Sequence, residues 1–266
     1  MTYHRPGRIV SRPLLVRPRP RPSAPRLLSL PPSLPKRNRP ISIVVPLKNR
    51  TRFKVTRGKK QLTLPLFENN VRALARLYDR RVDTWELVIA DYASDDVPNL
   101  QQYLQSIAGT IPVRVLQQPG PFNRGKARNA AARKASHDIL FFLDADMEIR
   151  TRRLFDDIER DLVRGGCALF PICYMYNTPQ HTTGSSHAAG FGNCVCTKKM
   201  YRNVGGFPEY TTWGREDRHF FMKFRSTRRW YYGEGFVHQW HPISPEFKDK
   251  YAVDTPRTAA LSSRRH

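Results

Sequence analysis

Two acidic residues lie directly after a strongly apolar run, where their spacing indicates metal chemistry. Asp144 and Asp146 follow residues 139–143, ILFFL, which predict a buried strand. Side chains two residues apart in an extended segment point to the same side, so we expect both carboxylates to face the same way. Paired carboxylates suit Mg²⁺ or Mn²⁺, and such an ion can hold a diphosphate. Capping of a strand-to-loop turn is the alternative interpretation of the pair.

A second acidic pair, Glu216 and Asp217, begins a predicted amphipathic helix. Trp213 and Gly214 precede the pair. An aromatic face beside a flexible glycine suits packing against a sugar ring, with a carboxylate base within reach. The alternative is simple capping, because the helix dipole stabilises carboxylates at a helix N-terminus.

Basic residues crowd the start of another predicted helix, in the stretch PFNRGKARNAAARKA at 121–135. Arg124, Lys126 and Arg128 lie where unpaired backbone N–H groups and guanidinium groups together make a cradle for phosphate. A solvated basic face on a very basic protein is the alternative.

Two histidines, His238 and His241, follow the last predicted strand in the sequence FVHQWHP. Imidazole is a common metal ligand, so one of them could complete the coordination of an ion held by the acids. A lone histidine is more often structural, and the sequence does not decide which of the two would bind.

The elements that must position these residues form an alternation of short apolar runs and amphipathic stretches. This alternation predicts the α/β class, with a mixed central sheet flanked by helices. The predicted strands are 41–46, 85–90, 112–116, 139–143, 168–176, 190–196 and 230–237. The predicted helices are 64–81, 100–107, 123–136, 151–164, 198–204 and 216–225.

Composition and charge exclude several classes of protein. The chain has 266 residues, 39% of them hydrophobic, which is enough for a core and excludes collagens, coiled coils and wholly disordered chains. Lys and Arg number 46 against 22 Asp and Glu, a formal charge of +24. We find no apolar run of about 18 residues, so we expect no membrane-spanning helix.

We expect three regions along the chain. Residues 1–40 contain ten basic residues, ten prolines and no acid, which predicts a disordered, extended arm. The arm serves either as a solubilising tail or as an electrostatic tether to nucleic acid or another polyanion. Residues 41–247 are expected to form the folded domain, and 248–266 a polar tail.

The cysteine pattern and the absence of a secretory signal favour a cytoplasmic protein. Cys167, Cys173, Cys194 and Cys196 show neither the CxxC pairs of a zinc site nor the density of a disulfide scaffold. We expect buried thiols in a reducing compartment, although the sequence leaves a disulfide open. The apolar pieces of residues 1–40 are too short for a signal peptide.

Four motifs in a fixed order resemble those of the GT-A glycosyltransferases. They are IVVPLKNR at 43–50, PFNRGKARN at 121–129, FFLDADM at 141–147 and GGFPEYTTWGRED at 205–217. More narrowly, they resemble the β-1,4-galactosyltransferase and chondroitin N-acetylgalactosaminyltransferase group, while WELVIADYASDD at 85–96 is closer to family 2 glycosyltransferases. The resemblance covers about residues 41–242 and implies a nucleotide-diphospho-sugar transferase fold.

The resemblance also implies roles for individual residues. Asp144 and Asp146 match the DxD motif, with Asp146 the firmer ligand of Mn²⁺ or Mg²⁺ and His238 or His241 a further one. Glu216 would bind the acceptor sugar and Asp217 would be the general base. The implied donor-binding residues are Pro46, Lys48, Arg50 and Asp91 at the nucleotide, Phe122 and Arg124 at the base and diphosphate, Trp213 and Gly214 in the wall shared by donor and acceptor, together with Lys126 and Asp144.

The implied reaction moves a sugar from a nucleotide-sugar donor, usually UDP-linked, to an acceptor hydroxyl with inversion. Three positions depart from the family patterns. Tyr92 and Ala93 replace an acid and a glycine after Asp91, and Arg218 stands where a third acid is common. The sequence lacks the membrane anchor and disulfides of secretory members, which favours an intracellular or virus-encoded relative.

Two other functions compete with transfer to a glycan, glycolipid or protein-linked sugar. The first is a glycosyltransferase whose acceptor is DNA, for example a hydroxymethylated base, which the basic arm and the positive charge favour. The second is a non-catalytic nucleic-acid-binding protein whose acidic motifs are only caps and turns, although no DNA-reading module is evident.

Overall fold

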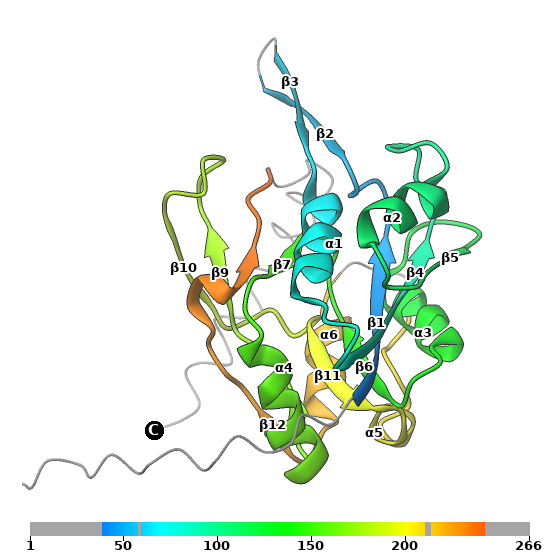
Figure 1. Cartoon of the computed structure of the whole chain (residues 1–266), viewed down its shortest axis with the longest axis vertical. Coiled ribbons are helices and arrows are strands. Elements are labelled where there is room, and N and C mark those ends of the chain that lie inside the picture. The colour runs from blue at the N-terminus through cyan, green and yellow to red at the C-terminus, as the bar shows by residue number, and fades with distance from the viewer. Residues whose placement is uncertain (1–38, 58–59, 211–213, 243–266) are drawn as a thin grey trace, which may run out of the picture. The chain divides into compact units, whose positions relative to one another are not determined.

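The large sheet of this protein joins seven strands in the order β12-β8-β11-β6-β1-β4-β5 (Figure 1). The computed structural model describes residues 39–57, 60–210 and 214–242. Neighbours β6, β1, β4 and β5 are parallel, whereas β11 runs antiparallel to β6 and to β8, so the sheet is mixed as predicted. The strands are β1 (Arg39–Leu47), β4 (Asp83–Asp91), β5 (Val113–Gln117), β6 (Ile139–Phe142), β8 (Ala168–Leu169), β11 (Cys194–Thr197) and β12 (Thr227–Arg228).

Helices cover both faces of the sheet, so its central strand β1 is buried on both sides. Successive residues of a strand point to opposite faces, so Ile43 and Val45 join one apolar cluster and Val44 joins the other. The first cluster includes α1 (Leu66–Leu77) and α2 (Leu100–Ala108). The second includes α3 (Arg124–Lys134), whose buried alanines let it lie close to β1 and β4.

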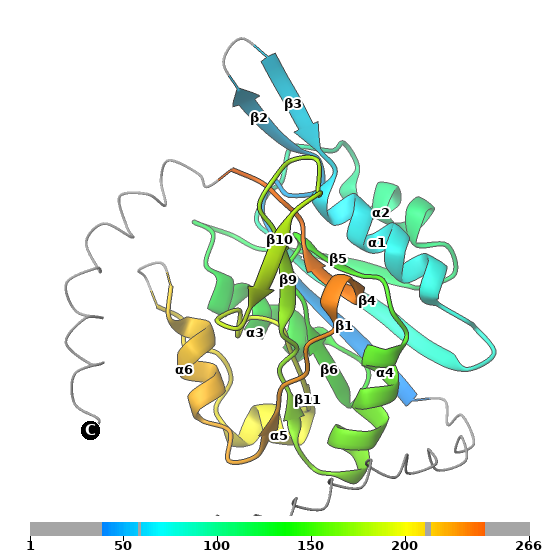
Figure 2. The same cartoon turned by 90° about the vertical axis from the view of Figure 1, so that its left-hand side faces the viewer.

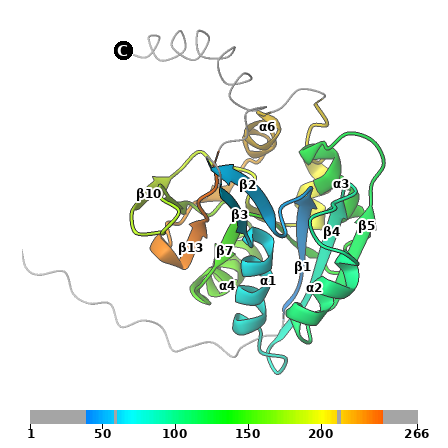
Figure 3. The same cartoon turned by 90° about the horizontal axis from the view of Figure 1, so that it is seen from above.

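A smaller sheet of four strands, in the order β10-β9-β13-β7, stands apart from the large one (Figure 3). Its central strand β13 pairs antiparallel with β7 and parallel with β9. The register places His238 opposite Met147, one residue after Asp146. This sheet therefore brings the histidine segment beside the acidic turn. Its strands are β7 (Met147–Ile149), β9 (Cys173–Tyr176), β10 (Gly184–His187) and β13 (Phe236–His238).

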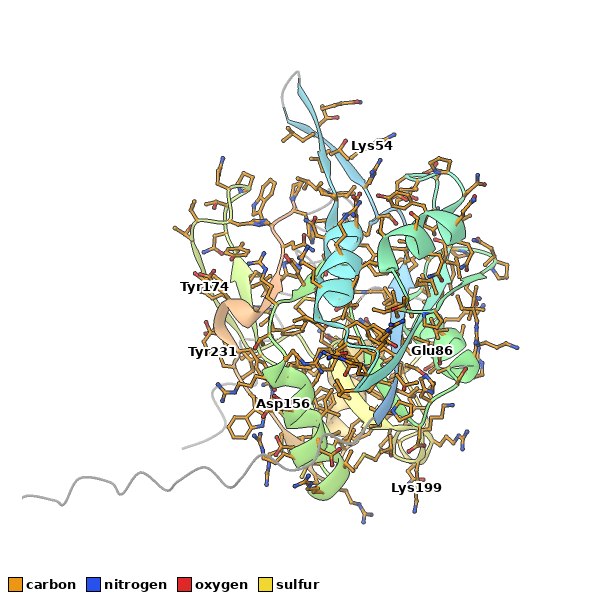
Figure 4. The ribbon with its side chains drawn as sticks, in the orientation of Figure 1. Lys54, Glu86, Asp156, Tyr174, Lys199 and Tyr231 are labelled. Atoms are coloured by element: carbon orange, nitrogen blue, oxygen red, sulfur yellow. The ribbon has the colours of Figure 1, made fainter. Side chains whose placement is uncertain are left out.

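A two-stranded hairpin of β2 (Phe53–Arg57) and β3 (Lys60–Leu64) projects beyond α1 (Figure 2). The sequence-based prediction did not include it. Apolar and polar residues alternate along both strands, and Lys54 extends outward from the hairpin (Figure 4). At its base, the rings of Phe53 and His241 make an edge-to-face contact with 6.1 Å between centroids. The hairpin thus reaches the metal-ligand candidates of the sequence.

Short helices complete the fold. They are α4 (Arg153–Asp157), the π-helix η1 (Ile158–Arg164), α5 (Lys198–Asn203), α6 (Glu216–Met222) and the 3-10 helix η2 (Gly233–Gly235). None of the helices within the described ranges combines the length and the apolar content that a bilayer crossing requires. All four cysteines lie within these ranges as buried free thiols, so the predicted buried thiols are confirmed and the disulfide left open is not formed.

Three predicted strands were wrong in extent. The run 168–176 is divided into β8 and β9, which belong to different sheets. Pro171 lies between them and has no N–H for a sheet ladder. Within 230–237 only the end is a strand, because β13 starts at Phe236 after a 3-10 turn. The predicted strand 190–196 begins only at Cys194, as β11. Strands β7, β10 and β12 were not predicted.

The close approach of α3 to the sheet gives a test of packing. Ala131 is fully buried against the sheet, so Ala131→Leu should lower the free energy of unfolding by about 1–3 kcal/mol through overpacking. Lys134→Leu, on the exposed side of the same helix, is the control and should have little effect. Urea unfolding measures both, and equal effects of the two variants would contradict the packing.

Candidate active site

The carboxyl ends of β1, β4 and β6 lie at one edge of the large sheet, because these strands are parallel neighbours. Crevices outside such ends are where open α/β sheets bind ligands. Hydrogen bonds of Asn49 help to join the loops after β1 and β4. The Asn49 N–H donates to Ser94 Oγ at 2.9 Å, and the Asp95 N–H donates to Asn49 Oδ1 at 2.9 Å. The loops that follow the strands therefore form one framework.

Asp91, at the end of β4, is buried and already hydrogen-bonded. Its carboxylate accepts from the Ser94 N–H and hydroxyl and from Gln117 Nε2 at 3.1 Å. The half-exposed ring of Phe122 makes an edge-to-face contact with the ring of Tyr92, the residue after Asp91, with 5.3 Å between centroids. Phe122 thus offers a flat apolar surface close to the end of β4, where a nucleotide base was expected.

The residues after β1 carry positive charge into the site. Lys48 Nζ donates to Ala93 O at 2.7 Å, which ties it to the β4 loop. The Arg50 guanidinium lies 3.9 Å from the centre of the Phe53 ring. Burial lowers the pKa of Arg50, while nearby Asp146 opposes that shift. Its Nη1 atom is buried and has no hydrogen-bond partner among the described residues.

Pro46, also expected at the nucleotide, is buried within β1, where it is paired with Ala90.

Asp144 and Asp146 do not share an extended segment, so that expectation was wrong. Ala145 and Asp146 form a turn, closed by a hydrogen bond from the Met147 N–H to Asp144 O at 3.1 Å. The turn sends the two carboxylates to different partners. Asn193 supports the first one, since its Oδ1 accepts from the Asp144 N–H at 2.9 Å and its Nδ2 donates to Asp144 Oδ2 at 3.4 Å.

Asp146 meets both candidate histidines. Its Oδ2 lies 3.2 Å from His241 Nε2 and 3.7 Å from His238 Nε2. Although burial acts to raise it, the two histidines hold the pKa of Asp146 below its usual range. Burial lowers the pKa of His238 against the pull of Asp146, which favours the neutral imidazole. One ligand atom from each of the three residues lies within 4.8 Å of the others, so the trio can surround one ion.

Arg128 connects the other acids. Its side chain is 1% exposed, with Nη2 at 2.5 Å from Asp144 Oδ1 and Nη1 at 3.2 Å from Glu216 Oε1. Arg124 Nε lies 3.3 Å from the same Glu216 oxygen. Burial acts to lower the pKa of Arg128, but Asp144 and Glu216 outweigh it and raise the pKa. A buried cation therefore holds the acid after β6 against the acid that begins α6.

The neighbours Glu216 and Asp217 have opposite environments. Burial acts to raise the pKa of Glu216, yet Arg124 and Arg128 hold it below its usual range. Burial and the adjacent Glu216 raise the pKa of Asp217. Pairs of carboxyl groups whose pKa values are driven apart in this way are typical of acid and base assignments in active sites. Asp217 is the member prepared to accept a proton.

Comparison with known proteins identifies the family of this chain. The sequence profile described as "Glycosyl transferase family 2" matches residues 42–236. This chain belongs to glycosyl transferase family 2. The resemblance stated from the motifs is confirmed, and the fold of this family 2 glycosyltransferase is the GT-A fold. A search of curated proteins found no match.

Solved structures share the fold of this glycosyltransferase. TarS from S. aureus, residues 1–349 in complex with UDP, is 17% identical with a TM-score of 0.57, and the match covers 80% of this chain and 62% of TarS. The mannosyltransferase PcManGT from Pyrobaculum calidifontis, in complex with GDP-Man and Mn²⁺, is 16% identical with a TM-score of 0.56, covering 90% and 69% of the two chains. This chain spans about three fifths of the TarS 1–349 chains.

The basic cradle expected at the start of α3 is divided in this glycosyltransferase. Asn123 caps the helix, with its Oδ1 accepting from the Lys126 N–H at 2.8 Å. Lys126 is exposed, whereas Arg124 and Arg128 turn toward Glu216. Arg124 and Arg128 are four residues apart and therefore share a face of the helix. This spacing is visible in the sequence and could have shown that Lys126 lies on a different face.

The loop before α6 holds the remaining expected residues. Gly214 has φ +93° and Arg215 has φ +69°, so this turn uses the left-handed region that glycine adopts without strain. Trp213, expected in the wall shared by donor and acceptor, lies outside the described residues. The sequence analysis also missed Asn193 and Gln239, buried amides that contact the acidic turn.

Gly192 tests the pair formed by Arg128 and Asp144. A Cβ at position 192 would lie 2.5 Å from Arg128 Nη2 and 2.8 Å from Asp144 Oδ2, so Gly192→Ala must displace the pair. We expect the free energy of unfolding to fall by about 1–3 kcal/mol, measured by urea unfolding. The matched control is Gly190→Ala, whose added Cβ would have its nearest neighbour at 3.9 Å. Similar losses in both variants would show that the pair is not tightly enclosed.

Proposed function

We propose that this family 2 glycosyltransferase moves a sugar from a UDP-linked donor to an acceptor hydroxyl, with inversion and with Mn²⁺ or Mg²⁺ bound. The observation that carries the proposal is that the acids at one edge of the sheet have different surroundings. Asp146 faces two histidines, while Asp217 has a raised pKa and remains partly exposed. A cation and a general base thus have separate positions.

The residues around Asp146 fit a divalent cation. Carboxylate oxygen and imidazole nitrogen are ligands that Mn²⁺ accepts. The buried Nδ1 of His238 has no hydrogen-bond partner within the described part of the chain, and the lowered pKa of this histidine favours the neutral form that ligates metals. PcManGT was solved in complex with both GDP-Man and Mn²⁺, which supports the proposal for this chain.

A bound cation would offset the negative charge that develops on the departing diphosphate. Arg50 and Arg124 supply further positive charge on the same side of the site and would bind the phosphates. Lys48 and Asp91 keep the loops around the nucleotide in place. Phe122 presents its exposed ring to the base.

Asp217 would take the proton from the attacking acceptor hydroxyl. A base placed to deprotonate an incoming hydroxyl opposite the leaving group supports in-line attack and therefore inversion. Glu216 would act on the acceptor through the arginines that hold it, because its carboxylate is buried in ion pairs with Arg124 and Arg128.

A nucleic-acid acceptor is the second candidate, and the net charge of +24 favours it. Counterion release would then make acceptor binding weaken steeply with salt. In this proposal residues 1–40 serve as a basic arm, 41–247 as the catalytic domain and 248–266 as a polar tail. Transfer to oligosaccharide acceptors that is insensitive to salt would count against a nucleic-acid acceptor.

Donor binding can be tested by thermal unfolding. A UDP-sugar and Mn²⁺ together should raise the melting temperature, because a ligand that binds only the native state stabilises it. Asp146→Asn should remove the part of this increase that depends on Mn²⁺. Asp156→Asn, on the exposed side of α4 (Figure 4), is the control and should retain it. An unchanged response in Asp146→Asn would contradict the metal site.

The pH dependence of transfer tests the base. Asp217 acts only when ionised, and burial and Glu216 disfavour that form, so the rate should fall as the pH drops through a pKa above the ordinary aspartate value. Asp217→Asn should abolish transfer.

The same variant should also unfold at an equal or higher temperature near neutral pH. The ionised carboxyl is disfavoured in the folded protein, so its contribution to stability falls as the pH rises through the window between the ordinary and the raised pKa. The exposed Asp138→Asn serves as control for both measurements. Retained transfer in Asp217→Asn would identify another group as the base.

A further inference from the structure

A buried glutamine, Gln239, lies between the two histidines of the site. It follows His238, the last residue of β13, and its side chain is fully buried. Its backbone N–H donates to Asp146 O at 2.9 Å. This bond continues the pairing of β13 and β7 one residue past the strand, so the backbone of Gln239 already touches the acidic turn.

The side chain of Gln239 joins helix α1 to the acidic turn. Its Nε2 donates to Leu66 O at the start of α1 at 2.8 Å, and it also lies 3.4 Å from Asp146 O and 3.5 Å from Met147 O. Its Oε1 accepts from Asn69 Nδ2 at 2.8 Å. The donor and the acceptor of this amide are therefore both engaged, and a buried polar group loses stability when either is left unpaired.

The same helix turn also reaches the other acid of the motif. Asn70, next to Asn69, places its Nδ2 at 3.5 Å from Asp144 O. Helix α1 thus contacts both ends of the turn from residue 144 to residue 146, once directly and once through Gln239. The turn is therefore held by α1 as well as by Arg128.

Within the described residues, a hydrogen bond and a ring contact also hold the segment after β13. The Trp240 N–H donates to His181 Nε2 at 3.2 Å, and the rings of Phe53 and His241 make an edge-to-face contact. His241 itself lies outside any strand or helix, yet its Nε2 reaches Asp146 Oδ2 at 3.2 Å. A side chain in irregular backbone keeps such a distance only if its neighbours are held.

We propose that Gln239, held by Asn69, is a positioning residue that fixes the Asp146 turn and the His238–His241 segment at the spacing required to bind a divalent cation. This inference rests on the metal-dependent function proposed above. Gln239 touches neither the ion nor the substrate in this proposal. It acts through the peptide carbonyl of Asp146 and through the chain between the histidines, and partners of this kind tune metal affinity.

The test measures binding of Mn²⁺ alone to the full chain by isothermal titration calorimetry, with thermal unfolding in the absence of metal as a second readout. Gln239→Met keeps the length of the side chain but removes both hydrogen-bonding groups. We expect it to weaken Mn²⁺ binding by about 10-fold or more, the range seen when outer-shell partners of metal ligands are removed.

Asn69→Ala gives the same test from outside the histidine segment and keeps the proposal open to refutation if Gln239→Met does not fold. It removes only the partner of Gln239 Oε1, so we expect a smaller loss of Mn²⁺ affinity in the same direction. Gln102→Met, on the exposed face of α2, is the matched control and should change neither affinity nor melting temperature.

The outcomes separate this inference from the proposed function. In one outcome, the unaltered protein binds Mn²⁺ and Asp146→Asn abolishes that binding, but Gln239→Met and Asn69→Ala bind the ion at full strength. This result would overturn the positioning role and leave the metal site standing. A lower melting temperature with unchanged affinity would show that Gln239 supports the fold only. An unaltered protein that binds no Mn²⁺ would overturn the metal site and the inference together.

Discussion

The buried guanidinium of Arg128 is the interaction on which the geometry of the site depends. Removing an ion from water costs several kcal/mol unless it is paired and hydrogen-bonded. Arg128 is paired twice, with Asp144 after β6 and with Glu216 at the start of α6. Three elements distant in sequence are thereby held at one point, and the edge of the large sheet acquires a defined arrangement of charge.

That arrangement gives chemically identical groups different roles. Asp144 and Glu216 are neutralised by arginine, and Asp146 faces two imidazoles. Burial and the adjacent Glu216 raise the pKa of Asp217. The function proposed for this family 2 glycosyltransferase follows from environment, since residue type alone would make all four acids equivalent.

Local patterns in the sequence predicted the features of the structure that depend on residues close together in the chain. Continuous apolar runs predicted β1, β4 and β6, and the order of motifs predicted the family that the profile match confirms. Contacts between distant segments were not predictable in this way. The role of Arg128 requires the packing of α3 against α6, and the ligand trio requires β13 to pair with β7. The β2–β3 hairpin, by contrast, has an alternating pattern that could have been recognised.

The small sheet has a consequence for the stability of different parts of the molecule. Asp146 directly precedes β7 and His238 ends β13, and both strands belong to the sheet of four short strands that is separate from the large sheet (Figure 3). Regions of a protein open with different free energies, often as units that coincide with such motifs. Opening of this one unit would disperse the ligand trio while the large sheet stayed intact. An ion bound by the trio would therefore slow amide hydrogen exchange most strongly in residues 147–149 and 236–238.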